Sequence, residues 1–137
     1  MSGGARLLVG VLVGVAALIG SGAPAQGPQA QSPQYLPFAE FAPNDSAGQR
    51  SARQAYNDAV ERYNNALYDY HVTLGQHDQL VEAYNRAGAP AEREKARADA
   101  APLRARLQTL RHDVTTLAAG VDQARRKASQ TGITLTR

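Results

Sequence analysis

The stretch AYNDAVERYNNALYDY, residues 55–70, carries a tyrosine every seven residues, at Tyr56, Tyr63 and Tyr70. His77 and Tyr84 continue the same spacing further along the chain. A seven-residue repeat of large rings is typical of a helix that packs along one seam of a coiled coil, with positions a and d facing the partner helix. We therefore assign this tyrosine ladder to position d of a long amphipathic helix.

Two stretches of the chain follow the same heptad pattern. Position a of the first stretch holds Val60, Leu67, Leu74 and Val81. Position d of the second stretch holds Ala96, Leu103, Leu110, Leu117 and Ala124, and its position a holds Ala100, Leu107, Val114, Val121 and Ala128. A fold at residues 88–89 brings every a residue opposite a d residue, as an antiparallel pair requires. The sequence therefore predicts an all-α fold, an antiparallel two-helix coiled-coil hairpin that could dimerise into a four-helix bundle.

The ends of both helices carry recognisable signals. Ser46 and Gln49 form a capping-box pattern, so we place the hairpin at 46–131, with helices at 46–87 and 90–130 and a turn at 88–89. Gly88 suits a left-handed C-terminal cap, and Pro90 suits the first turn of a helix. Thr131-Gly132 is expected to end the second helix before a short tail, 132–137.

Pro102 interrupts the second helical pattern, and Gly75 lies at the same level of the first helix. A proline inside a helix removes a hydrogen bond and clashes with the preceding turn. We expect a bend there, or alternatively a frayed turn before a helix that begins at Asp99. A further interpretation is that this level of the hairpin is a functional hinge.

The N-terminal residues resemble a secretory signal. Arg6 precedes an apolar run at 7–19, and Ala23-Pro24-Ala25 has the small residues of a cleavage site. We expect residues 1–25 to be a signal peptide cleaved after Ala25, which would export the protein to the periplasm or beyond. The alternative is that this segment is kept as a membrane anchor.

A Pro/Gln-rich segment, residues 26–45, follows and is expected to form a flexible arm. It contains YLPFAEFAP, residues 35–43, with both phenylalanines of the protein. One interpretation is a linker whose aromatic side chains pack back onto the base of the fold. The other is a short segment that docks a partner through Tyr35, Leu36, Phe38 and Phe41.

The tyrosine ladder itself has two interpretations. Rings at a core-facing position would be buried against aliphatic residues, with hydroxyls tipped out to water at the edge of the seam. The alternative is an exposed platform that stacks on glycans. The helical register favours the core interpretation, and His77 in the same column is expected to be a buried or edge histidine.

The two flanks of the seam differ. One flank is a polar stripe to which both helices contribute. The second helix contributes Arg97, Arg104, Arg111 and Arg125. The first helix contributes Asn57, Asn64, His71, Asp78 and Asn85. The arginines could bind an anionic polymer or lipid headgroup, or they could form an ordinary solvated face. The other flank holds the candidate partner face, Ala59, Ala66, Thr73, Leu80 and Ala87. Small residues there would let a second copy, or another protein, pack closely.

Composition argues against a metalloprotein, an enzyme and a nucleic-acid-binding protein. The chain of 137 residues has no cysteine and only three histidines, His71, His77 and His112, whose spacing fits no helical zinc site. We expect no metal, no cofactor and no enzymatic activity. Residues 26–90 hold four arginines and seven acids, whereas residues 91–137 hold ten basic residues and five acids. Because the two halves have opposite charge, they favour each other over nucleic acid.

The run Tyr56–Asn64 resembles the YNxAVxxYN stretch of LemA family helices. The resemblance covers nine residues and stops there, so we assign no family. The sequence as a whole favours an exported coiled-coil interaction or scaffold protein of the bacterial cell envelope, with at most peripheral membrane contact. The alternatives are a periplasmic holding chaperone for unfolded clients and a binder of anionic envelope polymers or lipid.

Overall fold

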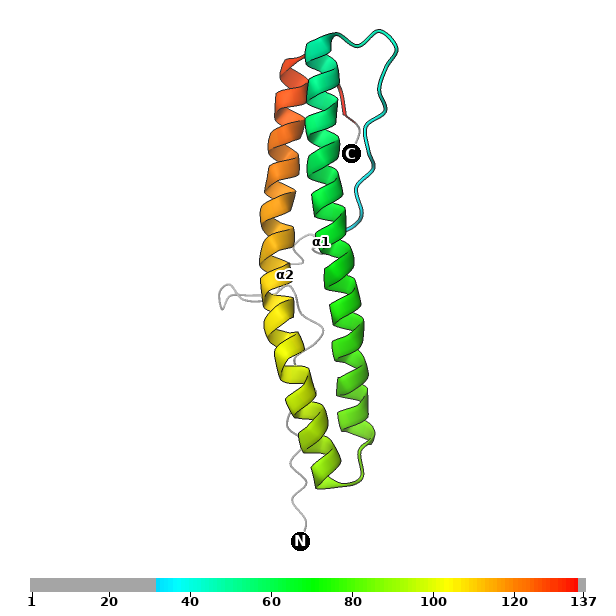
Figure 1. Cartoon of the computed structure of the whole chain (residues 1–137), viewed down its shortest axis with the longest axis vertical. Helices are drawn as coiled ribbons and strands as arrows, with labels where there is room; N and C mark the ends of the chain where they lie inside the picture. Colours follow the sequence, from blue (N-terminus) through cyan, green and yellow to red (C-terminus); the bar gives the residue numbers. More distant parts are fainter. Residues whose placement is uncertain (1–31, 136–137) are drawn as a thin grey trace, which may run out of the picture. The chain divides into compact units, whose positions relative to one another are not determined.

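The computed structural model describes residues 32–135, and the expected signal peptide at 1–25 lies outside this part of the chain. Two helices, α1 (Ala47–Arg86) and α2 (Pro90–Gln130), run antiparallel and pack along their length (Figure 1). At 1.5 Å per residue, helices of 40 and 41 residues are each about 60 Å long. The predicted all-α helical hairpin is confirmed.

The N-terminus of α1 has the predicted cap. The Gln49 amide donates to Ser46 Oγ at 3.2 Å, and the Ser46 amide donates to Gln49 Oε1 at 2.9 Å. These two bonds satisfy backbone and side-chain groups that would otherwise lack partners at a helix start. The chain therefore enters α1 at a defined residue.

The two helix C-termini end differently. The expectation of a left-handed glycine after α1 is wrong, because α1 is capped by Ala87 in an extended conformation and Gly88 has no positive φ. After α2, Gly132 does take a φ of 80°, which favours glycine. The Ile133 amide then donates to the Ala128 carbonyl, and the Ile133 side chain is buried. The C-terminal tail is thus folded back onto the hairpin.

Pro102 lies inside a continuous α2, so the alternative of a helix beginning at Asp99 is wrong. The α2 ribbon changes direction in its yellow part, around residue 102, in agreement with the predicted bend (Figure 1). Gly75 is exposed, and a Cβ added there would meet nothing within 4 Å. The glycine is therefore not required for close approach of the two helices.

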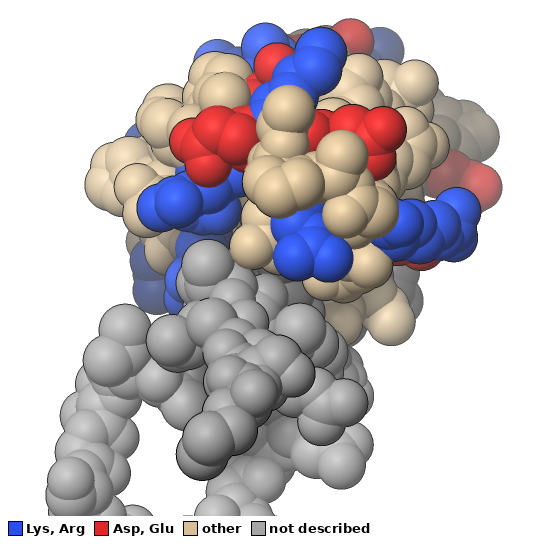
Figure 2. Space-filling view, turned by 90° about the horizontal axis from the view of Figure 1, so that it is seen from below, with Lys and Arg blue, Asp and Glu red and all other residues tan. Residues whose placement is uncertain are grey.

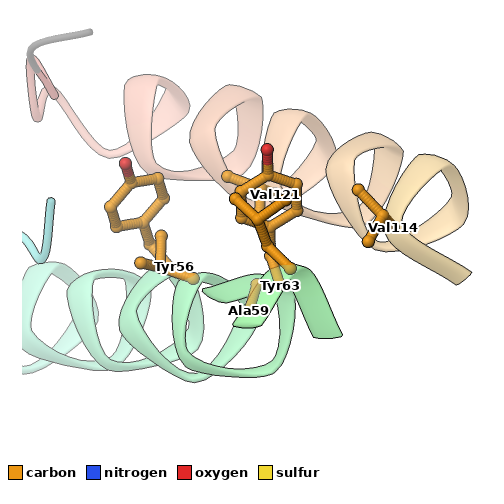
Figure 3. Close-up of a cluster of buried hydrophobic side chains, with 7 residues drawn as sticks. Tyr56, Ala59, Tyr63, Val114 and Val121 are labelled. Atoms are coloured by element: carbon orange, nitrogen blue, oxygen red, sulfur yellow. The ribbon is translucent and has the colours of Figure 1, made fainter. Parts of the chain in front are cut away.

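The hydrophobic core is concentrated at the end of the hairpin where the chain termini of the described part lie. Its members come from both helices and are Tyr56, Ala59, Val60, Tyr63, Leu67, Val114 and Val121 (Figure 3). Leu36 and Leu135, from outside the helices, pack against this cluster. A pair of helices buries little surface by itself, so the flanking segments complete the core at this end.

Towards the hairpin turn the same heptad positions are less enclosed. Leu74, Val81 and Leu103 are only partly buried, although they occupy positions a and d. The small residues Ala96 and Ala100 are buried there. Within residues 32–135, neither helix has an apolar stretch long enough to cross a membrane.

Candidate functional site

The most distinctive feature of the structure is an extended segment, residues 33–45, that runs back alongside α1 (Figure 1). We call this segment the docked arm. It is the described part of the Pro/Gln-rich stretch, and it has specific partners on α1. Asn57 and Asn64, which we call the asparagine pair, hold its backbone.

Each asparagine makes two hydrogen bonds to a single residue of the docked arm. The Leu36 amide donates to Asn64 Oδ1 at 2.9 Å, and Asn64 Nδ2 donates to the Leu36 carbonyl at 2.9 Å. The Ala39 amide donates to Asn57 Oδ1 at 2.7 Å, and Asn57 Nδ2 donates to the Ala39 carbonyl at 3.0 Å. A side-chain amide has a donor and an acceptor that match the backbone N–H and C=O of one residue, so these contacts recognise main chain and not side chain.

The spacing of the two contacts has a simple geometric cause. Seven residues of α-helix advance about 10.5 Å, and three residues of extended or polyproline-type chain advance about 9–10 Å. Asn57 and Asn64 are seven residues apart, and Ala39 and Leu36 are three apart. A heptad on α1 therefore matches a triplet on the docked arm, which lets the same contact repeat.

Two residues of the tyrosine ladder also bind the docked arm. The rings of Tyr56 and Tyr63 are buried, as predicted for core residues, and their hydroxyls point to the same side (Figure 3). The expectation that the hydroxyls face water is wrong for these two residues. Tyr63 donates to the Gln34 carbonyl at 3.2 Å, and Tyr56 donates to the Pro37 carbonyl at 3.5 Å. Burial also raises the pKa of Tyr63, so the hydroxyl keeps its donor proton to higher pH.

The side chains of the docked arm divide between two faces. Leu36 and Ala39 pack against the core cluster. Tyr35, Phe38 and Phe41, which we call the aromatic row, are 53%, 56% and 50% exposed. Packing against the core cluster therefore comes from Leu36 and Ala39, whereas the three aromatic side chains are about half covered.

The sequence of the docked arm explains this division. YLP, FAE and FAP, residues 35–43, form three triplets with an aromatic residue first and an aliphatic or small residue second. A polyproline-type helix has three residues per turn, so each position of a triplet occupies one face. The ring of Tyr35 also lies 6.2 Å from that of His71, the residue one heptad beyond Asn64.

A turn joins the docked arm to α1 and is held by Asp45. The Ala42 amide donates to Asp45 Oδ2 at 2.9 Å, and Arg53 Nε lies 2.7 Å from the same oxygen. The bond from Ala42, aided by the Arg53 guanidinium, holds the pKa of Asp45 below its usual value of 3.8 despite its burial. The ionised carboxylate thus fixes the base of the docked arm.

This shift predicts a pH dependence of stability. A carboxyl with a lowered folded-state pKa stabilises the fold above its unfolded pKa, and the effect is lost as pH falls through the lower folded pKa. We expect the difference in thermal midpoint between the natural chain and Asp45→Asn to be largest above about pH 5 and to shrink below pH 3.8. Calorimetric melting of both chains between about pH 2.5 and 7 measures this. A difference that does not vary with pH would contradict the assignment.

The structure places the candidate partner face beside the seam. Ala59 and Thr73 are buried within the hairpin, and Ala66, Leu80 and Ala87 are partly buried. A hollow of about 550 Å³ lies next to Ala59, and small residues from both helices, Ala52, Ala55, Gly120 and Ala124, line part of it. The side chains of Ala59 and Thr73 are largely enclosed, so a partner in the hollow would contact mainly its other lining residues.

The four arginines of the candidate anion-binding surface differ in exposure and in their contacts. Arg97, Arg104 and Arg111 are exposed, and Arg97 lies 4.0 Å from Glu94. Arg125 is mostly buried, pairs with Asp122 at 3.0 Å and lies over the ring of Tyr56. Seen from the hairpin-turn end, basic and acidic side chains are interspersed (Figure 2). The binding of anions by this set stays a prediction.

His77 is buried, in agreement with the interpretation of a buried or edge histidine. Neither ring nitrogen has a hydrogen-bond partner, and Nδ1 lies 3.6 Å from Asp78 Oδ1. Among residues 32–135, no group of three or more His, Cys, Asp or Glu side chains could hold a metal ion.

The sequence interpretation missed the role of the asparagine pair. It assigned Asn57 and Asn64 to a polar stripe beside the arginines, whereas they bind the backbone of the docked arm. One signal was present, because asparagine follows tyrosine at both heptads and the triplets of residues 35–43 have the matching axial step. No protein-family model, curated protein or solved structure matches this chain.

Proposed function

We propose that this protein is an exported, non-enzymatic interaction or scaffold protein of the bacterial cell envelope, and that a partner docks on the aromatic row. The observation that carries the proposal is the row itself. Tyr35, Phe38 and Phe41 are each about half exposed while the backbone between them is hydrogen-bonded to α1. Export rests on the N-terminal sequence alone.

An ordered row of aromatic side chains has the properties of a docking surface. Aromatic residues dominate the binding energy of protein interfaces, because they bury much apolar area at a small entropic cost. Here the backbone is already ordered, so a partner does not have to bear the cost of ordering it. Three half-exposed aromatic side chains within one short segment are also a common mark of an interaction surface.

The partner is either a second copy of the chain or another envelope protein. A second copy could use the aromatic row or the hollow beside Ala59, and either contact would extend the two-helix core. We propose no nucleic-acid partner, because acidic residues offset most of the positive charge. Membrane contact would be peripheral.

The proposal predicts that changing Phe38 and Phe41 to serine removes the partner and leaves the hairpin folded. Both side chains are about half exposed and neither belongs to the core cluster, so the expected change in thermal midpoint is small. Loss of two interface aromatics is expected to weaken partner binding by about 30-fold or more. The measurement is crosslinked co-purification from the native envelope, with the bound proteins identified by mass spectrometry.

A matched control replaces Tyr68 by serine, since this tyrosine is 60% exposed but lies on α1 outside the docked arm. One stoichiometric partner that is lost only in the Phe38→Ser/Phe41→Ser chain would support an adaptor. Recovery of the protein alone would support self-assembly. Equal recovery of the same partner by all three chains would contradict docking on the aromatic row.

A holding chaperone is the second candidate, and the asparagine pair favours it. Contacts that recognise main chain tolerate many sequences, as a binder of unfolded clients requires. Broad recovery of unfolded proteins in the same experiment would support this candidate. The third candidate, an anion-binding surface formed by the exposed arginines, predicts binding that weakens strongly with salt.

A further inference from the structure

We propose that the face of α1 beneath the docked arm is a binding site for extended polypeptide in trans, and that the docked arm is its resting occupant. The ligand is a segment of another protein with a small or aliphatic side chain at every third residue. The site consists of the asparagine pair and the hydroxyls of Tyr56 and Tyr63. The site contacts the backbone of the docked arm and not the side chains of Phe38 and Phe41, so it does not depend on the proposed function.

The hydrogen bonds at this site are made to main-chain atoms of the docked arm. Asn57 and Asn64 each bind one amide and one carbonyl, and the two tyrosines donate to two further carbonyls. Side-chain contacts come from Leu36 and Ala39, which pack against the core cluster, and from Tyr35, whose ring lies 6.2 Å from that of His71. Another extended polypeptide that presents backbone N–H and C=O groups with the same three-residue spacing would make the same hydrogen bonds to the two asparagines and the two tyrosines.

The polar groups of the site need an occupant. The amide groups of Asn57 and Asn64 are partly buried, as are the tyrosine hydroxyl contacts. Removing the docked arm would expose the apolar surface that Leu36 and Ala39 cover and break all of these bonds. A second polypeptide would cover the apolar surface again and remake the hydrogen bonds. It could therefore replace the docked arm.

The connection to α1 allows such an exchange. The docked arm is joined to the helix through the short turn at Ala42–Asp45, and it contributes no strand or helix to the fold. Its tether gives it a high effective concentration at the site, so a free peptide competes poorly with it. The site therefore becomes accessible in trans when the docked arm is weakened or held elsewhere.

Proline substitution in the full chain weakens the docked arm without altering the site. Leu36→Pro with Ala39→Pro removes the two amide donors and keeps an extended backbone. Gln34→Pro with Glu40→Pro is the matched control, because it adds two prolines at exposed positions outside the asparagine contacts. The probe is a fluorescent peptide of sequence SPQYLPFAEFAP, residues 32–43, followed by anisotropy.

We expect the Leu36→Pro/Ala39→Pro chain to bind one peptide, about tenfold or more tighter than the intact or control chains. Adding Asn57→Ala and Asn64→Ala should abolish this gain. A peptide N-methylated at its Leu36 and Ala39 amides should not bind. A peptide with alanine at Phe38 and Phe41 should bind within about threefold, because these two side chains are about half exposed and do not pack against the core cluster. Tyr35 is kept in the peptide because its ring lies against that of His71.

Three results would overturn the proposal. The first is no saturable binding to the Leu36→Pro/Ala39→Pro chain. The second is equal binding when Asn57 and Asn64 are alanine, or when the peptide amides are methylated. The third is loss of binding when Phe38 and Phe41 of the peptide are alanine, since recognition would then use these side chains. None of these results bears on partner docking by the intact chain, so the two proposals are tested separately.

Discussion

Replacing Leu67 by alanine is expected to lower the free energy of unfolding by about 2–5 kcal/mol. Leu67 has no exposed surface and belongs to the core cluster with Val60 and Val114. Truncation removes the transfer free energy of its buried methyl groups and leaves a cavity that two long helices cannot close without losing other contacts. Urea denaturation followed by circular dichroism measures the change.

The matched control is Leu74→Ala, at the same heptad position one heptad nearer the hairpin turn. Leu74 is only partly buried, so the expected loss is smaller, about 1–2 kcal/mol. The contrast tests whether stability is concentrated at the end covered by the docked arm and the C-terminal tail. Equal losses at both positions would show that the core is uniform along the hairpin.

Replacing both Asn57 and Asn64 by alanine is expected to release the docked arm and keep the helices. The change removes four hydrogen bonds worth about 0.5–1.5 kcal/mol each, or about 2–6 kcal/mol of docking free energy together. Alanine also favours the helix more than asparagine does, so α1 itself is not weakened. Loss of helicity in this variant would contradict the assigned role.

Hydrogen exchange reports the release directly. The amides of Leu36 and Ala39 lose their acceptors, so their exchange should accelerate by about 30-fold or more. Asn85→Ala is the control, because Asn85 occupies the same heptad position but is exposed. That substitution should leave the exchange of both amides unchanged. Unaltered exchange in the double variant would mean that other contacts hold the docked arm.

Much of the fold could be predicted because its signals are local and periodic. The heptads identify the faces of α1 and α2, Ser46 and Gln49 mark the start of α1, and Pro90 marks the start of α2. Each of these features acts within one or two helical turns, so a short window of sequence contains it. The Gly88 prediction failed because proximity to a turn does not by itself require a positive φ.

The candidate site could be predicted only in part. Tyr35, Phe38 and Phe41 were singled out as a docking segment, and the structure leaves all three half exposed. Ala59 and Thr73 were expected on an open partner face, but they are enclosed by the hairpin. Position g adjoins the core positions, and small side chains there let the helices approach closely enough to cover them.

By itself, the sequence determined that two long helices pair antiparallel, because heptad spacing and the break at residues 88–89 fix both the faces and the direction of the chain. Only the tertiary structure decided where the docked arm lies and which of its side chains meet water. Its anchoring bonds join residues 18 and 28 positions apart, and no local propensity encodes such contacts. They form because a triplet of extended chain and a heptad of helix advance by nearly the same distance, about 10 Å.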